Sequence, residues 1–302
     1  MKKLVMICIV LLLATGVASA KEKPVMETGS KDFLEFTVSL SKSTYIEGEP
    51  VIATFALKNN SSTDQRLAEP TTSYGIVKYG IEMISGIYPM PKRTFGSQPG
   101  PPDDYGWVFR KGEARSIQVD LLSNYNGFLP VGRFCAKVTY SGVDTIEGIW
   151  HGSIEVSDLV FSVVPATGIE ESASRIFRAS VLQVLRGYEA EEAAKAAAAL
   201  HDLADPAKGG RFAQYAGYWE AMAYMKAGNS EKEIEVLMQY SEKHSDVPAY
   251  GTNAPRYIGD ILYCQKNYAK ARKMFEKLPD GFERQDWLKR CDKRLSESSS
   301  NP

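Results

Sequence analysis

Two different periods of apolar and polar residues divide this chain. Across residues 33–164, short runs alternate apolar and polar positions, and turn residues separate the runs. Side chains of a strand point alternately to its two faces, so this period predicts an antiparallel sandwich of about seven strands. The clearest strands are predicted in FLEFTVSLSK, VIATFALKNN, ARSIQVDLL, GRFCAKVTYS and SIEVSDLVFSVV. In the second of these, the face expected to be buried carries Val51, Ala53, Phe55 and Leu57.

From Ile169 onward the period becomes helical. ASRIFRASVLQVL and AEEAAKAAAALHDL place apolar residues three and four positions apart, and the second is so rich in Ala that helices can approach closely. Pro165 and Gly168 mark the joint between the two halves. Breakers separate the predicted helices at Gly187, ADPAKGG, residues 227–229, DVPAYGTNAP and LPDG. The predicted fold class is therefore a two-domain chain, an all-β sandwich followed by an all-α array of helical hairpins.

The first twenty residues have the layout of a secretory signal: two lysines, an apolar run, and small residues up to Ala20. The apolar run is short for a membrane span of roughly 20 residues. Cleavage after Ala20 is expected rather than a retained anchor, so the chain would meet the membrane only through this segment before cleavage. The predicted organisation is a signal peptide at 1–20, a linker at 21–31, the sandwich at 32–165, the helical domain at 166–295 and a disordered tail at 296–302.

Composition narrows the function classes. The whole chain has 36 Lys and Arg and 37 Asp and Glu. Loss of Lys2 and Lys3 with the signal segment would leave 36 − 2 = 34 basic residues against the 37 acidic ones. A slightly acidic balance disfavours nucleic-acid binding through a basic face. Cys135, Cys264 and Cys291 would remain after cleavage, and an oxidising compartment permits one disulfide. Cys264 with Cys291 is the favoured pair, and the alternative is that all three are small buried apolar residues.

YIEGEPVIATFALKNNS resembles the opening strands of bacterial immunoglobulin-like domains, where a Gly-Glu-Pro turn leads into a strand that ends in Asn-rich polar residues. GFLPVGRFCAKVTYSG resembles their late strand, which a Pro and Gly turn precedes and Tyr140 closes. This resemblance implies a fold and almost nothing about activity. The sandwich also resembles small secreted proteinase-inhibitor-like domains of bacteria, which implies inhibition of a protease through one loop end.

The helical half resembles a short tetratricopeptide-repeat array. Gly259, Tyr268, Ala271 and Phe275 have its spacing of a small residue, an aromatic, a second small residue and a large core residue. The equivalent positions 38 residues earlier are Ala221, Ser230, Glu233 and Leu237. The segment 180–206 resembles a weaker third unit, and GFERQDWLKRCDKRL resembles a capping helix with Trp287 and Leu288 facing inward.

The segment from 85 to 113 is the least regular part of the sandwich. It is rich in Pro, Gly and aromatic residues, too apolar for a simple linker and too broken for a strand. Two interpretations remain open. Either its aromatic residues cover one end of the sandwich, or they form a recognition loop for a peptide or glycan; these residues are Tyr88, Phe95, Tyr105 and Trp107.

Catalytic chemistry is not apparent in the sequence. The three histidines fall in different predicted elements and belong to no metal-ligand motif, although His201 and Asp205 lie one helical turn apart. No nucleophile elbow, P-loop or dinucleotide fingerprint occurs. No catalytic residue, metal site or cofactor is therefore predicted.

These patterns predict a non-catalytic adaptor of the cell envelope, secreted to the periplasm or beyond, that presents a helical-repeat groove to a protein or peptide partner. The first helices of two units supply the candidate partner-binding residues Tyr218, Glu220, Tyr224, Tyr257, Asp260 and Tyr263. The alternatives are the inhibitor-like sandwich and an envelope enzyme with a site at the domain joint.

Overall fold

A computed structural model describes residues 25–68, 76–86, 107–125, 127–142, 148–186, 189–280 and 282–300. It confirms the predicted order of a β-rich N-terminal half followed by an all-helical C-terminal half. The predicted signal peptide, the start of the predicted linker and most of the irregular segment, with Tyr88, Phe95 and Tyr105, lie outside the described residues. None of the helices in those described ranges is long and apolar enough to cross a membrane.

The first sheet is antiparallel with the strand order β1-β2-β4-β8. Its strands are β1 (Val25–Lys31), β2 (Leu34–Leu40), β4 (Ile52–Asn59) and β8 (Ala114–Asp120). The alternation in β2 and β4 turns one apolar face inward, and the face predicted in the sequence is buried in full.

The second sheet has the order β3-β10-β9-β6. Its strands are β3 (Thr44–Ile46), β10 (Ser153–Val164), β9 (Gly132–Ser141) and β6 (Val77–Gly86), and a separate two-stranded ribbon pairs β5 (Gln65–Leu67) with β7 (Trp107–Phe109). The two sheets pack face to face, with the Phe36 ring 5.5 Å from Tyr140 and the Phe55 ring 6.3 Å from Tyr79. Trp107 also packs against this core.

Two segments of the sandwich half differ from expectation. Residues 25–31 are expected in a linker, but they form β1 and pair along the whole length of β2. No strand is predicted between FLEFTVSLSK and VIATFALKNN, yet residues 44–46 form β3, which pairs in parallel with the end of β10. The backbone groups of both segments find hydrogen-bond partners in neighbouring strands, which the local pattern of residues does not reveal.

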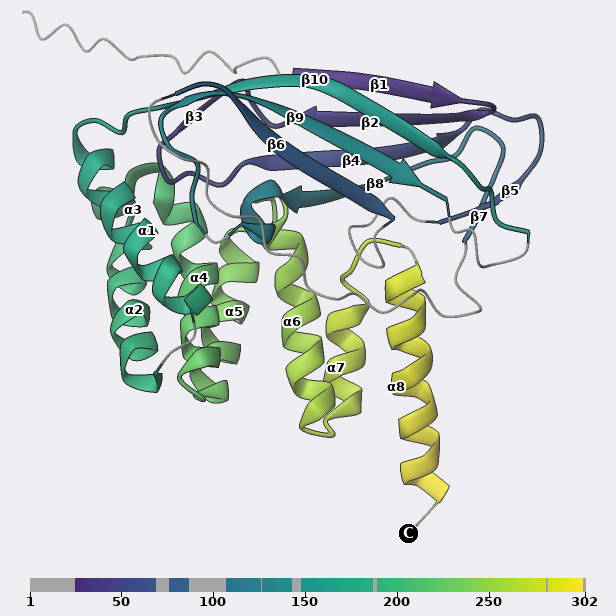
Figure 1. The fold of residues 1–302 in the computed structure, drawn as a ribbon. Coiled ribbons are helices and arrows are strands. Elements are labelled where there is room, and N and C mark those ends of the chain that lie inside the picture. The colour runs from purple at the N-terminus through teal and green to yellow at the C-terminus, as the bar shows by residue number, and fades with distance from the viewer. Residues whose placement is uncertain are drawn as a thin grey trace, which may run out of the picture.

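Strand β10 ends at Val164 and α1 begins at Ile169, so the predicted joint at Pro165 to Gly168 lies between the two halves. Its helices pack as successive antiparallel neighbours beneath the sheets (Figure 1). They are α1 (Ile169–Arg186), α2 (Ala190–Leu203), α3 (Pro206–Gly209), α4 (Ala213–Lys226), α5 (Ser230–Lys243), α6 (Tyr250–Cys264), α7 (Tyr268–Phe275) and α8 (Phe282–Ser300), with a 3₁₀ turn η3 (Gly210–Phe212) before α4.

The positions predicted to be equivalent at a spacing of 38 residues have matching burial in α4–α5 and α6–α7. The buried pairs are Ala221 with Gly259, Glu233 with Ala271, and Leu237 with Phe275. Gly259 leaves no room for a side chain, because an added Cβ would lie 2.5 Å from Cε1 of Phe275. The small residue at this position therefore lets the second helix approach the first.

Two boundaries and one expected disulfide in the helical half also differ from expectation. The connection DVPAYGTNAP is helical from Tyr250 onward and includes Pro255 inside α6. The predicted tail is helical as far as Ser300, where Ser296 and Ser298 donate side-chain hydrogen bonds to carbonyls of the preceding turn. Cys264 and Cys291 do not form the favoured disulfide, because Cys264 is exposed at the end of α6 whereas Cys291 faces the helical core from α8.

Phe275 should be the most sensitive single position in the last hairpin. Its ring is fully buried and stacks on Trp287 at 4.7 Å. We expect Phe275→Ala to lower the free energy of unfolding by about 3–5 kcal/mol, measured by urea denaturation. The exposed Lys273 on the same helix provides the control, and Lys273→Ala should change stability by less than about 0.5 kcal/mol. Equal effects of the two substitutions would contradict the assigned core.

Candidate functional site

The sandwich and the helices share an apolar seam. Ile46 of β3 and Ile52 of β4 belong to the sandwich by sequence, yet both are buried in the hydrophobic cluster of the helical half. Phe128 contacts both cores, and its ring lies 6.1 Å from that of Phe177 in α1. The domain joint is therefore a packed interface rather than a flexible link.

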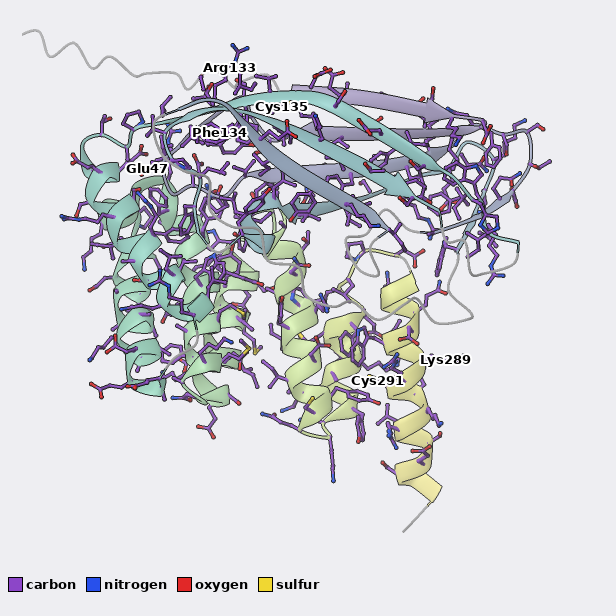
Figure 2. All side chains as sticks on the ribbon, viewed as in Figure 1. Glu47, Arg133, Phe134, Cys135, Lys289 and Cys291 are labelled. Carbon is purple, nitrogen blue, oxygen red and sulfur yellow. The ribbon has the colours of Figure 1, made fainter. Side chains whose placement is uncertain are left out.

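Polar contacts fix the same joint. The Ser174 hydroxyl of α1 donates to the Glu47 carbonyl, and the Arg178 guanidinium contacts the Glu47 carboxylate at 2.5 Å. Figure 2 labels Glu47 beside the upper end of α1. Gly48 has a positive φ of 91°, and a Cβ there would collide with Arg178. Only glycine therefore accommodates both this turn and the close approach of α1.

A concavity of about 490 Å³ opens at this joint. The sandwich contributes the end of β8, the 3₁₀ turn η2 (Leu121–Asn124) and Phe128, and the helical half contributes α1, α4 and α6. Its walls are largely apolar and aromatic: Val119, Leu122, Phe128, Val181, Val184, Leu185, Tyr218, Trp219, Met222, Met225, Tyr250 and Tyr257. We call this concavity the joint pocket. Its size and lining suit one or two large apolar side chains of a ligand.

Three charged groups line the joint pocket: Asp120, Lys226 and Arg256. Asp120 accepts hydrogen bonds from the Leu122 amide at 2.9 Å and from the Tyr250 hydroxyl at 2.7 Å. Burial raises the pKa of the Asp120 carboxyl to about 6. One oxygen of Asp120 thus caps η2 and the other joins β8 to α6, while Lys226 and Arg256 supply positive charge to the pocket walls.

Two of the six predicted partner-binding residues, Tyr218 and Tyr257, line the joint pocket. Tyr218 is only 7% exposed, and its ring packs against Tyr250 at 4.8 Å and Tyr257 at 5.9 Å. Burial raises the pKa of the Tyr218 hydroxyl well above its ordinary value. Tyr218 is therefore part of the pocket wall and core, whereas Tyr257 keeps part of its surface accessible.

Glu220 and Tyr224 lie on a different side of α4. They line a second concavity of about 550 Å³ between α2, α4 and α5. Glu220 is buried and lies 3.1 Å from Nδ1 of His201, and burial raises the pKa of its carboxyl. The sequence groups these two residues with Tyr218 because they share a helix, but they point away from the joint pocket.

Asp260 and Tyr263 follow the pocket residues along α6. Asp260 is not among the residues that line the joint pocket; its carboxylate lies 3.8 Å from the guanidinium of Arg256, which does line it, one turn earlier on α6. Tyr263 packs against Tyr268 at 5.1 Å and Trp287 at 5.4 Å, at the junction of α6 with α7 and α8. The structure therefore does not gather the six candidates into one surface.

Sequence reasoning did not find the sandwich side of the joint pocket. Asp120 stands at the end of a strand, where an acidic residue is common, and Tyr250 falls in a segment expected to be a connection. One signal was present. Asp120 precedes a short apolar turn and acts as its N-cap, a role that its position before Leu121 and Leu122 suggests.

The titratable residues show no metal centre within the ranges that the structure describes, since no three His, Cys, Asp or Glu side chains group together there. His201 and Asp205 do not act as a pair. His201 turns to Glu220, and Asp205 accepts the Ala207 amide at 3.0 Å as the N-cap of α3.

Comparison with known proteins adds no assignment. No protein-family model matches the chain, and no curated protein shows significant similarity to it.

The Asp120 carboxyl should make the joint sensitive to pH. Its pKa is about 6 in the folded protein against an ordinary 3.8, so between these values the folded state holds a proton that the unfolded chain has lost. Its contribution to stability therefore falls as the pH rises from about 4 to 6. Asparagine does not titrate in this range. We therefore expect the free energy of unfolding of Asp120→Asn, relative to that of the wild type, to rise by about 1–3 kcal/mol from pH 4 to pH 7, measured by urea unfolding at each pH.

The control for this experiment is Glu231→Gln, which changes an exposed carboxyl at the start of α5. Its difference from the wild type should stay within about 0.5 kcal/mol over the same range. A difference between wild type and Asp120→Asn that does not change with pH would contradict the assigned environment of Asp120.

Proposed function

We propose that this protein is a non-catalytic binding protein, an adaptor that holds a peptide segment of a protein partner at the joint pocket. The single observation that supports this most is the pocket itself, an apolar and aromatic concavity of about 490 Å³ with two cations at its walls. Recognition sites for peptides typically combine apolar anchors with a few placed polar groups. The pocket offers both.

We further propose that the sandwich is immunoglobulin-like and the helical half tetratricopeptide-like. The facing sheets support the first resemblance, and the matched burial of Ala221 with Gly259 and of Leu237 with Phe275 supports the second. In such arrays the first helix of each hairpin lines the concave side, and α4 and α6, which are first helices, contribute to the joint pocket.

We also propose that the protein is bacterial and exported to the periplasm or beyond. The support is the layout of residues 1–20, with lysines, a short apolar run and small residues before Ala20. Its partner would then be a protein or peptide of the cell envelope.

Of the alternatives, an enzyme with a site at the domain joint would use the same concavity. The titratable groups among its described lining residues are Asp120, Lys226, Arg256, Tyr218 of α4 and the two tyrosines of α6. Asp120 already accepts hydrogen bonds from the Leu122 amide and from the Tyr250 hydroxyl, which leaves it poorly placed to exchange protons with a substrate. The arrangement therefore favours binding over catalysis.

Two exposed methionines provide a matched test of this proposal. Met225 on α4 lines the joint pocket and is 41% exposed, whereas Met238 on α5 lies outside it and is 43% exposed. Peptides should be selected on the purified chain from a displayed random library, and their affinities measured by calorimetry. Met225→Glu should weaken binding about tenfold or more, since it places a charge against the apolar anchor, and Met238→Glu should have little effect.

Equal loss with both variants would place the contact elsewhere. Failure to select any peptide whose binding depends on Met225 would overturn the proposed function. Thermal unfolding of both variants would show whether each remains folded, because an exposed methionine contributes little to stability.

A further inference from the structure

Strand β8 forms one edge of the first sheet. It pairs with β4 on one side, and none of the described residues pairs with its other side. Figure 1 shows β8 as the member of this sheet nearest to the helices, with the upper end of α6 beside it. The unpaired edge of the strand therefore faces the space between the two halves of the molecule.

The register identifies the backbone groups at this edge. At one end of the strand Asn59 donates its amide to the Glu113 carbonyl, and at the other Leu121 donates to Val51. The pairing between these two bonds has no register shift. In an antiparallel ladder alternate residues bond to the same neighbour, so the odd-numbered residues face β4. The N–H and C=O groups of Ala114, Ser116 and Gln118 consequently point to the unpaired edge.

Strand β8 carries neither Lys nor Pro, and its pairing with β4 has no bulge; its one inward-pointing cation, Arg115, lies over the Trp107 ring at 4.2 Å. Natural edge strands are commonly blocked by Lys, Pro or a bulge. The residues whose backbone groups point to the unpaired edge are small or polar instead, and two of them, Ala114 and Ser116, are exposed. No residue of β8 is fully buried, in contrast to the alternating burial of β2 in the same sheet. Within the part of the chain that the structure describes, the edge is therefore open to an added strand.

Two concavities lie at the ends of β8. The joint pocket lies at its C-terminal end, from Ile117 to Asp120. A concavity of about 880 Å³ lies at its N-terminal end, lined by Trp107, Arg110, Glu113 and Arg115 together with Asp280 and Gln285 of the helical half. The strand edge thus connects two concavities, each lined by residues of both halves of the molecule. Strand β8 has seven residues and is roughly 23 Å long, so an extended segment of seven residues would reach from one concavity to the other.

We propose that the partner segment binds as an added β-strand along the free edge of β8. This inference rests on the proposed function, and it specifies the conformation and chemistry of the bound segment. The segment is an extended stretch of about seven residues, whose backbone pairs with Ala114, Ser116 and Gln118. Its alternate side chains on the helical side of the sheet are apolar and enter the joint pocket.

Side-chain directions support this placement. Ile117 and Val119 pack against the sandwich core, so the alternate residues Gln118 and Asp120 point to the outer face of the sheet. There Gln118 accepts the Ala249 amide at 3.4 Å and Asp120 accepts the Tyr250 hydroxyl. Side chains of an added strand on this same face would meet α6 and the pocket that it lines.

Charge complementarity specifies one residue of the segment. Lys226 and Arg256 line the joint pocket, and among the described lining residues the carboxyl of Asp120 is held in hydrogen bonds. Arg256 already lies 3.8 Å from the Asp260 carboxylate, so a carboxylate on the bound segment, next to its apolar anchor, would pair with Lys226. The proposed occupant therefore carries an acidic residue among alternating apolar ones. A helical segment satisfies its own backbone groups and would leave the edge of β8 unpaired.

The test is a scan of backbone methylation along a synthetic peptide obtained from the library selection described above. Each amide nitrogen is methylated in turn, which removes one donor and adds bulk without changing the side chains. We expect losses of about tenfold or more at alternate residues and small changes between them, because only every second amide of an added strand faces β8. Affinity is measured by calorimetry.

The protein side of the same pairing offers a matched pair of variants. Ser116→Pro removes an outward N–H that the sheet itself does not use, whereas Ser116→Ala removes only the hydroxyl. We expect Ser116→Pro to weaken binding of the unmethylated peptide about tenfold and Ser116→Ala to leave it unchanged. If Ser116→Pro does not fold, as judged by circular dichroism, the methylation scan decides alone.

The outcomes separate this inference from the proposed function. Binding that depends on Met225 but shows no alternating methylation pattern overturns strand addition and leaves the binding function intact. Sensitivity at every third or fourth residue would indicate a helical segment instead. Dimerisation of the free chain that Ser116→Pro abolishes would show that a second copy of this chain occupies the edge, and would also overturn the inference. Absence of any peptide dependent on Met225 overturns both proposals.

Discussion

The packing of Ile46 and Ile52 against the helices is the interaction on which the rest of the structure depends. Both residues lie in strands of the sandwich, and both are buried with side chains of the helical half. Full burial of an isoleucine contributes about 1.5–3 kcal/mol, so the pair supplies a sizeable part of the 5–15 kcal/mol that typically separates folded from unfolded protein. The hydrogen bond between Asp120 and Tyr250 then adds direction to this non-directional contact.

This seam also forms the walls of the joint pocket, the site that we propose for the partner segment. The inner side of α4 and α6 faces the end of β8, so the concave surface of the helices is closed along one side by a sheet. The joint pocket consequently has walls that neither half contains alone. A helical array by itself offers side chains to a ligand, whereas here the neighbouring strand edge also offers backbone donors and acceptors. The combination favours ligands by conformation as well as by composition.

The change of hydrophobic period near Pro165 was enough to predict the order of the two halves. Burial of one face imposes a period of about two residues on a strand and about 3.6 residues on a helix, so each half shows its own period. The spacing of 38 residues likewise identified Phe275 and Leu237 as core positions. The site was harder to predict. Its two halves meet through contacts such as Asp120 with Tyr250, 130 residues apart, and no local pattern encodes such a contact. Glu220 and Tyr224 were misgrouped because helix position alone does not show which face a neighbouring helix covers.

The separation between Asp120 and Tyr250 has a consequence for synthesis of the chain. Domains generally fold as they emerge from the ribosome, the N-terminal one first. The sandwich is complete at Val164, but α6, which closes the joint, follows 86 residues later at Tyr250. At a typical 5–20 residues per second, the nascent sandwich therefore carries the surface around Asp120 without its α6 partner for roughly 4–17 s. During that interval the surface is open to chaperones and to other nascent chains, so the order of the two domains sets a period of vulnerability that the finished molecule no longer shows.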